Sequence, residues 1–412
     1  MRDYLLELAL RRWNKISTYI NTISLEDYRE IAKRLWMDYK PVSRDVESFI
    51  AVDGSSNLLN LRDFSVYSVI GYGVEKTSKG IAQRMVGDIG VLAFPRTSDI
   101  ARVLREICEL KTALMSDQER VLVDGSLTSL LINPEPMAGF IKFEDAYAGT
   151  IQELGEEVFD ELWSRLRVQV EELKESTVYY EDPFVSRLIL ENKNIDRSTG
   201  EMALVLLVFI EKLLSLRILL EKTVGKEPDG SMVFISKTSR SKLYYERFIK
   251  QDLSKASIAG GKTITPSDMS TFGELIINEG FSRPIILEEV GFVKTLPSKG
   301  VLKSLIGDFY SNVGLILSYV RLLRGGPVVK LEIPFSNKYK MDEEKAAAIV
   351  KNVVDHIYPL SYNGYPYPLL QADKLSKITR DDIIAIAYTL KVLPHWSGRE
   401  VLGEWVLYHD ED

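Results

Sequence analysis

Cysteine is nearly absent from this sequence of 412 residues, and its scarcity excludes two kinds of site. The single cysteine, Cys108, cannot form an intrachain disulfide and cannot supply a zinc site made of several thiolates. Cys108 lies in an apolar helical pattern, which predicts a small core residue rather than a nucleophile. So low a cysteine content is typical of a reducing compartment, and we expect the protein to be cytoplasmic.

An excess of positive charge is also absent. The chain has 52 Lys and Arg residues against 59 Asp and Glu residues, which gives a formal net charge of −7. The overall field of the protein therefore does not attract anions. If the chain binds an anionic partner, it must do so through a local basic patch.

The sequence has no uninterrupted apolar run of membrane-spanning length. Its most apolar stretch, 202–220, contains Glu211, Lys212 and Arg217, and this pattern predicts a buried helix rather than a membrane span. No segment resembles the glycine-rich Walker P-loop that binds nucleoside triphosphates, so any ATP-driven motion must come from a partner.

The hydrophobic pattern that is present predicts an α/β protein. Apolar and β-branched runs predict strands at 49–53, 66–76, 84–94 and 120–124, with an amphipathic helix at 98–115 between the last two. Ser98 is the expected N-cap of that helix.

The rest of the chain begins with a helical region and then alternates. Helical periodicity runs from about residue 141 to residue 222. A strand followed by a basic loop is expected at 230–241, a strand at 326–335 and a helix at 342–360. The segment 364–382 predicts a turn followed by a helix.

The tetrapeptide Val-Asp-Gly-Ser occurs twice, at 52–55 and at 123–126, each time after an apolar strand. One copy alone is a common strand-to-turn signal. Two carboxylates, Asp53 and Asp124, at the ends of neighbouring strands repel each other unless a cation neutralises them. Hard divalent cations such as Mg²⁺ or Mn²⁺ prefer oxygen ligands, and glycine allows close approach. The repeat therefore predicts a divalent metal site.

The helix between the two motifs supplies a third acidic residue. The strand from Arg120 to Asp124 is about 13 Å long at about 3.3 Å per residue. A helical stretch of that length, counted back from Met115 at about 1.5 Å per residue, reaches Glu106, whereas Glu109 is only about 9 Å back. We therefore expect Glu106 to join the site and keep Glu109 as the alternative. Aspartate, glutamate and aspartate on strand, helix and strand is the arrangement of the ribonuclease H-like fold, which cleaves phosphodiesters with two metals.

Four segments make the sequence resemble the NurA family of archaeal nucleases. These are "FIAVDGSSN", "RVLVDGSL", "FISKTSRS" and "GYPYPLLQADKLSKI", and the last is the most specific. The resemblance extends over essentially the whole chain. It implies a ribonuclease H-like mixed sheet with flanking helices and a helical insertion.

The resemblance also implies an activity and partners. Members of the family cleave single- and double-stranded DNA with Mn²⁺ or Mg²⁺, including 5′–3′ exonuclease and single-strand endonuclease action. The family resects DNA ends for double-strand break repair by homologous recombination. It works as a homodimer with the HerA helicase, a hexameric ATP-dependent translocase.

The domain division expected from this resemblance has four parts. Residues 1–45 form an N-terminal helical segment, and 46–140 form the first part of the nuclease core. Residues 141–225 form the helical insertion, and 226–412 complete the core with the C-terminal motif helix.

Carried over by motif, the family implies a set of site residues. Asp53, Asp124 and Glu106 would hold the metal, joined by Asp373 from the C-terminal motif. Tyr365, eight positions before Asp373, would orient a water molecule or a phosphate.

The C-terminal motif departs from the family at one position. Family members often carry a histidine where this chain has Asp373, and aspartate is the harder donor for Mg²⁺ or Mn²⁺. None of the three histidines, His356, His395 and His409, is expected to act as a replacement ligand. The departure puts the metal preference, and even the activity, in question.

The basic loop after the fifth predicted strand is the expected DNA contact. Lys237 and Arg240 in "SKTSRS" suit contacts with phosphates. Arg321, Arg324 and Lys330 are further cations near a predicted strand end.

Two alternatives stay open at this point. An actin-like or sugar-kinase-like ATPase also has a ribonuclease H-like core, but the turn at 125–131 comes too early for the second half of a duplicated fold. A catalytically weak dimeric subunit that only docks onto a helicase is the other alternative, and Asp373 is the feature that favours it.

Overall fold

The computed structural model describes most of the chain. The described residues are 2–21, 26–46, 48–61, 63–93, 97–132, 143–176, 178–191, 193, 197–249, 266–288 and 299–392.

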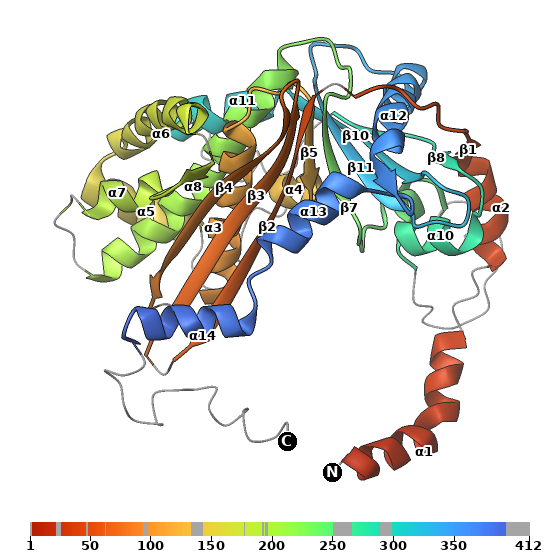
Figure 1. The fold of residues 1–412 in the computed structure, drawn as a ribbon, viewed down its shortest axis with the longest axis horizontal. Coiled ribbons are helices and arrows are strands. Elements are labelled where there is room, and N and C mark those ends of the chain that lie inside the picture. The colour runs from red at the N-terminus through yellow and green to blue at the C-terminus, as the bar shows by residue number, and fades with distance from the viewer. Residues whose placement is uncertain are drawn as a thin grey trace.

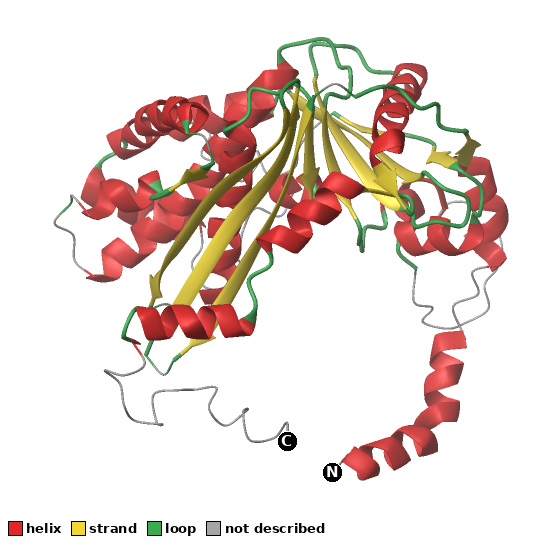
Figure 2. Cartoon of the chain, in the orientation of Figure 1, coloured by secondary structure: helices red, strands yellow, loops and turns green. Residues whose placement is uncertain are grey.

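A mixed sheet forms the centre of the molecule, and helices cover both of its faces (Figures 1 and 2). Within the described residues the sheet has eleven strands. In spatial order they are β1 (Trp36–Asp38), β8 (Gly280–Ser282), β10 (Val313–Arg321), β11 (Val329–Ser336), β7 (Met232–Ser236), β5 (Val121–Asp124), β2 (Phe49–Asn60), β3 (Ser65–Thr77), β4 (Gly80–Leu92) and β6 (Tyr179–Tyr180), with β9 (Ile285–Leu287) paired to β10.

The centre of the sheet is parallel, and the strands on either side of it pair antiparallel, except β6, which pairs parallel with β4 at one edge. Strand β5 lies between β2 and β7 and runs parallel to both. Strands β2, β3 and β4 form an antiparallel meander. The predicted order of three strands, a helix and a fourth strand is confirmed, because β2, β3 and β4 are followed by a helix and then by β5. Strands β2 and β5 run in the same direction, and β5 ends at Asp124. The strand end expected at Asp53 is wrong, because β2 continues through Gly54 and Ser55 to Asn60 in its pairing with β3.

One long helix covers the sheet beside these strands. Helix α3 (Thr97–Leu114) packs on β2 and β3 through a buried apolar face that includes Ile107 and Cys108. Burial raises the pKa of the Cys108 thiol well above its usual value, as expected of a core residue. The helix begins at Thr97, so Ser98 lies inside the first turn and is not the N-cap.

The region between β5 and β7 is mainly helical. Its elements are α4 (Leu127–Ile132), α5 (Phe143–Leu154), α6 (Glu157–Glu175), α7 (Val185–Glu191) and α8 (Arg197–Val224). Helices α5, α6, α7 and α8 gather on the left of the view, whereas α4 lies near the middle, and α8 packs on α3 (Figure 1). Glu211 inside α8 forms a fully buried ion pair with Lys111 of α3 at 2.5 Å, which explains how this apolar helix accommodates charges.

The remaining elements complete the two ends of the molecule. They are α1 (Arg2–Asn21), α2 (Glu26–Leu35), a π-helical turn (Tyr245–Ile249), α10 (Asp268–Leu275), a second π-helical turn (Lys303–Gly307), α11 (Asp308–Tyr310), α12 (Glu343–Ile357), a 3₁₀ turn (Tyr358–Leu360), β12 (Ser361–Tyr362), β13 (Tyr365–Pro366), α13 (Tyr367–Ser376) and α14 (Arg380–Thr389). Helix α13 lies on the face of the sheet in front of β2 (Figure 1).

The N-terminal segment is not entirely helical. Residues 36–38 form β1, which pairs with β8 at the edge of the sheet through Trp36 and Ser282. This pairing joins segments about 240 positions apart, so the local helical pattern does not predict it. Among the described residues, no helix has both the length and the apolar character needed to cross a membrane.

Candidate metal centre

Two aspartates lie where the parallel pairing of β2 and β5 ends. Val52 pairs with Val123 in the last register position that the two strands share. The next residue of each strand is an aspartate, Asp53 or Asp124. Because the strands are parallel neighbours, both carboxylates lie at the same end of the β2–β5 pairing. The two Val-Asp-Gly-Ser motifs thus meet in space.

A pair of glycines allows helix α3 to pack closely against β2 and β3 next to these aspartates. Gly54 and Gly71 are register partners on β2 and β3. A Cβ on Gly71 would lie 2.4 Å from the carbonyl oxygen of Cys108, and a Cβ on Gly54 would lie 2.5 Å from Cγ of Glu109. Neither position has room for a side chain. The absence of both side chains therefore allows α3 to place Glu109 directly over the residue that follows Asp53.

Glu106, the residue expected from helix length, faces a different neighbour. Its carboxylate pairs with the Lys212 ammonium of α8 at 3.2 Å. Glu106 would reach the site if the helix ran beside β5, but α3 packs across β2 and β3. The turn that reaches Asp53 is consequently one turn later, and the geometry favours the alternative, Glu109.

The second aspartate is held by two residues from other parts of the chain. The Lys237 ammonium lies 2.7 Å from Oδ2 of Asp124 and 2.9 Å from Oδ2 of Asp373. The Tyr365 hydroxyl donates a hydrogen bond to Oδ2 of Asp124 at 3.1 Å. The same ammonium lies 5.0 Å from the centre of the Tyr365 ring. The structure therefore brings together Asp124, Lys237, Tyr365 and Asp373 as the motifs predicted.

The carboxyl groups near this place have raised pKa values, and burial is the largest cause in each case. Burial, and next the charge of Asp124, raise the pKa of Asp53 to about 7. Burial raises the pKa of Glu109 to about 8; the Arg105 guanidinium opposes this and the charge of Asp53 adds to it. Burial also raises the pKa of Asp124 against the opposing effect of Lys237. Carboxyl groups with pKa values raised in this way are typical of a functional site.

Arg105 is a site residue that the sequence reasoning missed. Its guanidinium pairs with Glu109 at 3.0 Å, one helical turn away. The charges of Glu109, Glu106, Asp53 and Asp124 all raise its pKa, although burial opposes them. The spacing of four residues between Arg105 and Glu109 was the available signal, because such residues share one helix face.

The donor set fits a hard divalent cation. In the present arrangement of side chains, no group of three acidic, histidine or cysteine residues in the described part of the chain converges as a formed metal site. Arg105 and Lys237 instead neutralise Glu109 and Asp124. The oxygen donors are nevertheless the ligands that Mn²⁺ and Mg²⁺ prefer. Asp373 has a side chain that is 56% exposed, so it borders the centre from the solvent side.

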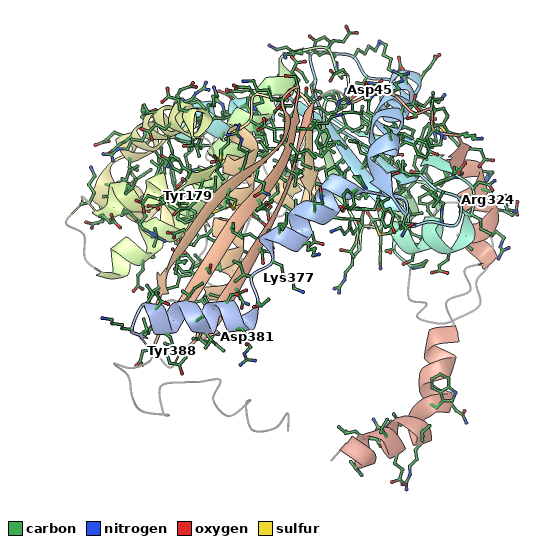
Figure 3. The ribbon with its side chains drawn as sticks, in the orientation of Figure 1. Asp45, Tyr179, Arg324, Lys377, Asp381 and Tyr388 are labelled. Atoms are coloured by element: carbon green, nitrogen blue, oxygen red, sulfur yellow. The ribbon has the colours of Figure 1, made fainter. Side chains whose placement is uncertain are left out.

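The other predicted cations have different surroundings. Arg321 is buried and donates to the carbonyl oxygens of Gly273 and Gly326, so it does not face a DNA strand. Arg324 is exposed at the edge of the molecule away from α13 (Figure 3). Arg240 is exposed on the loop after β7. His395 and His409 lie outside the described residues.

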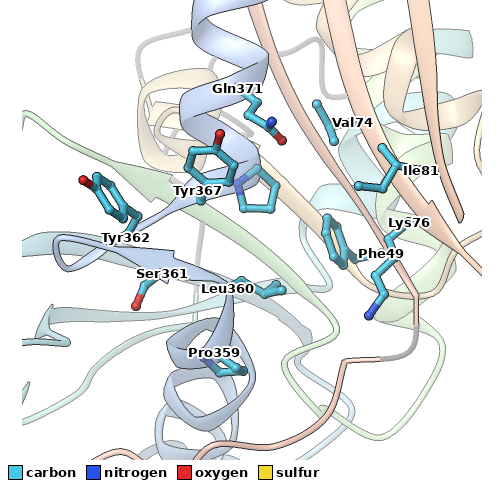
Figure 4. A pocket seen from close by; sticks show the side chains of 11 residues that line it. Phe49, Val74, Lys76, Ile81, Pro359, Leu360, Ser361, Tyr362, Tyr367 and Gln371 are labelled. Carbon is cyan, nitrogen blue, oxygen red and sulfur yellow. The ribbon is translucent and has the colours of Figure 1, made fainter.

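A large groove lies at the start of α13, on the same motif that carries Tyr365. It has a volume of about 780 Å³ and is lined by Phe49, Tyr362 and Tyr367 among others (Figure 4). Tyr362 and Tyr367 are 62% and 49% exposed and pack edge to face. The groove therefore presents two aromatic rings to solvent close to the C-terminal motif.

Comparison with known proteins places the chain in a family. The model of the NurA domain matches residues 47–378. The DNA double-strand break repair nuclease NurA of Sulfurisphaera tokodaii is 23% identical over 396 residues, which cover 94% of each chain. The NurA nuclease from Sulfolobus solfataricus has the same fold, with a TM-score of 0.63, 20% identity and coverage of 97% of this chain and 99% of that one. A NurA structure bound to dAMP and manganese is similar with a TM-score of 0.66, 17% identity and coverage of 97% and 99%. The matched domain carries both Val-Asp-Gly-Ser motifs, the basic loop and the C-terminal motif, and on this evidence the chain belongs to the NurA family.

Proposed function

We propose that this chain is a metal-dependent DNA nuclease of double-strand break repair. The observation that carries the proposal is that the parallel pairing of β2 and β5 brings Asp53 and Asp124 to the same place, with Glu109 of α3 packed against Gly54, the residue after Asp53. A relative that matches almost the whole chain is named for this repair activity, and a similar structure holds manganese and dAMP. Phosphodiester hydrolysis with Mn²⁺, or with Mg²⁺, is the activity that this arrangement supports best.

In the proposed centre, Asp53, Glu109 and Asp124 hold the cation and Asp373 completes the set from the solvent side. The bound ion would supply Lewis acidity and a nucleophilic water near neutral pH. Lys237 pairs with Asp124 and Asp373. The Lys237 ammonium would contact the phosphate and stabilise its developing charge when Asp124 is bound to the cation instead. Tyr365 orients Asp124 through its hydrogen bond.

The finer activity follows from the family resemblance. We infer 5′–3′ exonuclease and single-strand endonuclease action on DNA ends, in resection for homologous recombination in the cytoplasm. A HerA-type hexameric translocase would feed the strand, since the chain has no P-loop of its own. We also infer a homodimer. Measurement of the mass in solution by light scattering, alone and with a HerA-type partner, tests both associations.

The aromatic groove supports single-strand binding. Tyr362 and Tyr367 are exposed rings of the kind on which unpaired bases stack, at about 1–3 kcal/mol per base. Tyr367 begins α13 and belongs to the same motif as Tyr365 and Asp373, and Tyr362 lies just before that motif. We infer that this groove receives bases of the strand that reaches the metal centre.

Cleavage of end-labelled linear DNA tests the proposed function. The wild-type chain and Asp53→Ala are compared with EDTA, Mg²⁺ or Mn²⁺. The proposal predicts metal-dependent shortening that vanishes with EDTA and in the variant. An absence of cleavage with every metal, also with a HerA-type partner and ATP present, would contradict it and favour a docking subunit.

A further inference from the structure

We propose that a pocket beside the metal centre binds a second phosphate group of the DNA strand, next to the phosphodiester that is cleaved. The pocket has a volume of about 360 Å³, and we call it the hydroxyl pocket because Ser126, Thr128 and Ser239 line it. Arg240 and Lys330 also belong to its lining. The inference rests on the proposed function and names a subsite for the same substrate.

The chain itself connects the hydroxyl pocket to the metal centre. Ser126 is the last residue of the second Val-Asp-Gly-Ser motif and follows Asp124 by two positions. Two residues span at most about 7 Å, so the pocket begins close to the proposed metal ligand. Ser236, just before Lys237, donates a hydrogen bond from its hydroxyl to the carbonyl oxygen of Gly125 at 2.7 Å. The two walls of the pocket are thereby fixed to each other.

Hydrogen bonds among the residues of the hydroxyl pocket orient their ammonium and hydroxyl donor groups. The Lys330 side chain is 4% exposed, and its ammonium donates to the hydroxyl oxygens of Ser126 at 3.1 Å and of Thr128 at 3.0 Å. The Thr128 hydroxyl in turn donates to Glu332. The Ser126 oxygen already accepts from Lys330, so its own hydrogen is left to donate, either to Thr128 or to a bound anion.

The charge in the hydroxyl pocket comes mainly from Arg240. Buried Glu332 pairs with Lys330 at 2.6 Å and neutralises it. None of the residues that line the pocket is acidic, and Arg240 is exposed at its mouth. A guanidinium with several hydroxyl groups around it recognises a tetrahedral oxyanion, because each phosphate oxygen can accept a separate hydrogen bond. The lining has no aromatic ring on which a base could stack, so we assign the pocket to a phosphate and not to a nucleobase.

Salt dependence of DNA binding tests this assignment without cleavage. A single-stranded oligonucleotide labelled at its 3′ end is titrated with the Asp53→Asn protein at several salt concentrations, with either a 5′-phosphate or a 5′-hydroxyl. Arg240→Gln, Arg240→Lys and Arg324→Gln are then compared in the same background. Removal of one phosphate contact lowers the slope of log affinity against log salt by about 0.7 for a single strand.

We expect Arg240→Gln to lower the slope by this amount, while Arg240→Lys and the control Arg324→Gln keep it. An effect confined to the 5′-phosphorylated strand identifies a terminal phosphate as the ligand, and an effect on both strands identifies an internal one. An unchanged slope for Arg240→Gln, or an equal loss for Arg324→Gln, overturns the assignment. Failure of wild-type cleavage with an intact slope change would contradict the nuclease and leave the subsite standing.

Discussion

Glu109 and Glu106 lie one turn apart on the same helix but have opposite environments. Glu109 packs against Gly54, the residue after Asp53, and pairs with Arg105. Glu106 neutralises Lys212, whose side chain is 3% exposed. One carboxylate thus adds negative charge to the proposed metal centre, and the other stabilises the packing of α3 on α8.

We expect Glu109→Gln and Glu106→Gln to have contrasting effects on cleavage and on stability. Glu109→Gln removes a proposed metal ligand, so it lowers metal-dependent DNA cleavage by at least ~100-fold. It lowers the melting temperature of the metal-free protein less than Glu106→Gln does, because its cationic partner Arg105 is 31% exposed. Glu106→Gln leaves a buried ammonium unpaired, so it costs about 3 kcal/mol of stability and keeps cleavage below its melting temperature. Cleavage rates and thermal unfolding of both variants provide the check. Normal cleavage by Glu109→Gln would assign the third carboxylate elsewhere.

At the scale of elements, the close approach of α3 to the sheet depends on the contact between Gly71 and the backbone of α3. A Cβ on Gly71 would meet the Cys108 carbonyl at 2.4 Å and the Glu109 backbone nitrogen at 2.6 Å. Both are backbone atoms, so a side chain can be accommodated only if the helix moves.

Gly71→Ala is therefore expected to cost about 1–3 kcal/mol through overpacking. Because the shift of α3 also carries Glu109 away from Asp53, cleavage should fall at least ~10-fold at temperatures where the variant is folded. Gly273→Ala in α10 is the control, since its Cβ meets nothing within 4 Å; it should stabilise the helix by up to about 1 kcal/mol and leave cleavage unchanged. Full activity in folded Gly71→Ala would argue against this role of the glycine pair.

The sequence predicts these elements where the pattern is local. The strands that carry Asp53 and Asp124, the helix between them and the basic loop with Lys237 are all found, because short apolar runs determine them. The turn expected after Asp53 is absent, because pairing with the distant residues of β3 extends β2 to Asn60. Which helix residue meets Asp53 depends on how α3 crosses β3, and this depends on the contact at Gly71 between distant segments. Strand β1 is missed for the same reason, since only its pairing with β8 makes it a strand.

At the scale of the whole molecule, the raised carboxyl pKa values link stability to pH and metal. In the folded protein Asp53 has a pKa of about 7 and Glu109 of about 8, against about 4 in the unfolded chain. The folded state therefore binds protons more tightly, and the stability of the metal-free protein falls as the pH rises from about 4 to about 8.

We predict that Mn²⁺ reverses this loss. Because the ion binds the deprotonated carboxylates, its stabilising effect should grow between pH 5 and pH 8, by on the order of 2 kcal/mol. Melting temperatures with EDTA and with Mn²⁺ across this range measure the effect. Asp53→Asn, as the matched variant, should have a flatter metal-free profile. A metal-free protein that gains stability toward pH 8 would contradict the assignment of the raised pKa values.

Binding of Mn²⁺ itself tests the central claim most directly. Titration of the ion, followed by the electron paramagnetic resonance signal of free Mn²⁺, is carried out for the wild type and for Asp53→Asn, Asp124→Asn, Glu109→Gln and Glu106→Gln. We predict that the first three substitutions weaken Mn²⁺ binding by at least ~10-fold and that Glu106→Gln binds like the wild type. Equal binding by all five proteins, or no binding by the wild type, would contradict a metal centre formed by β2, α3 and β5.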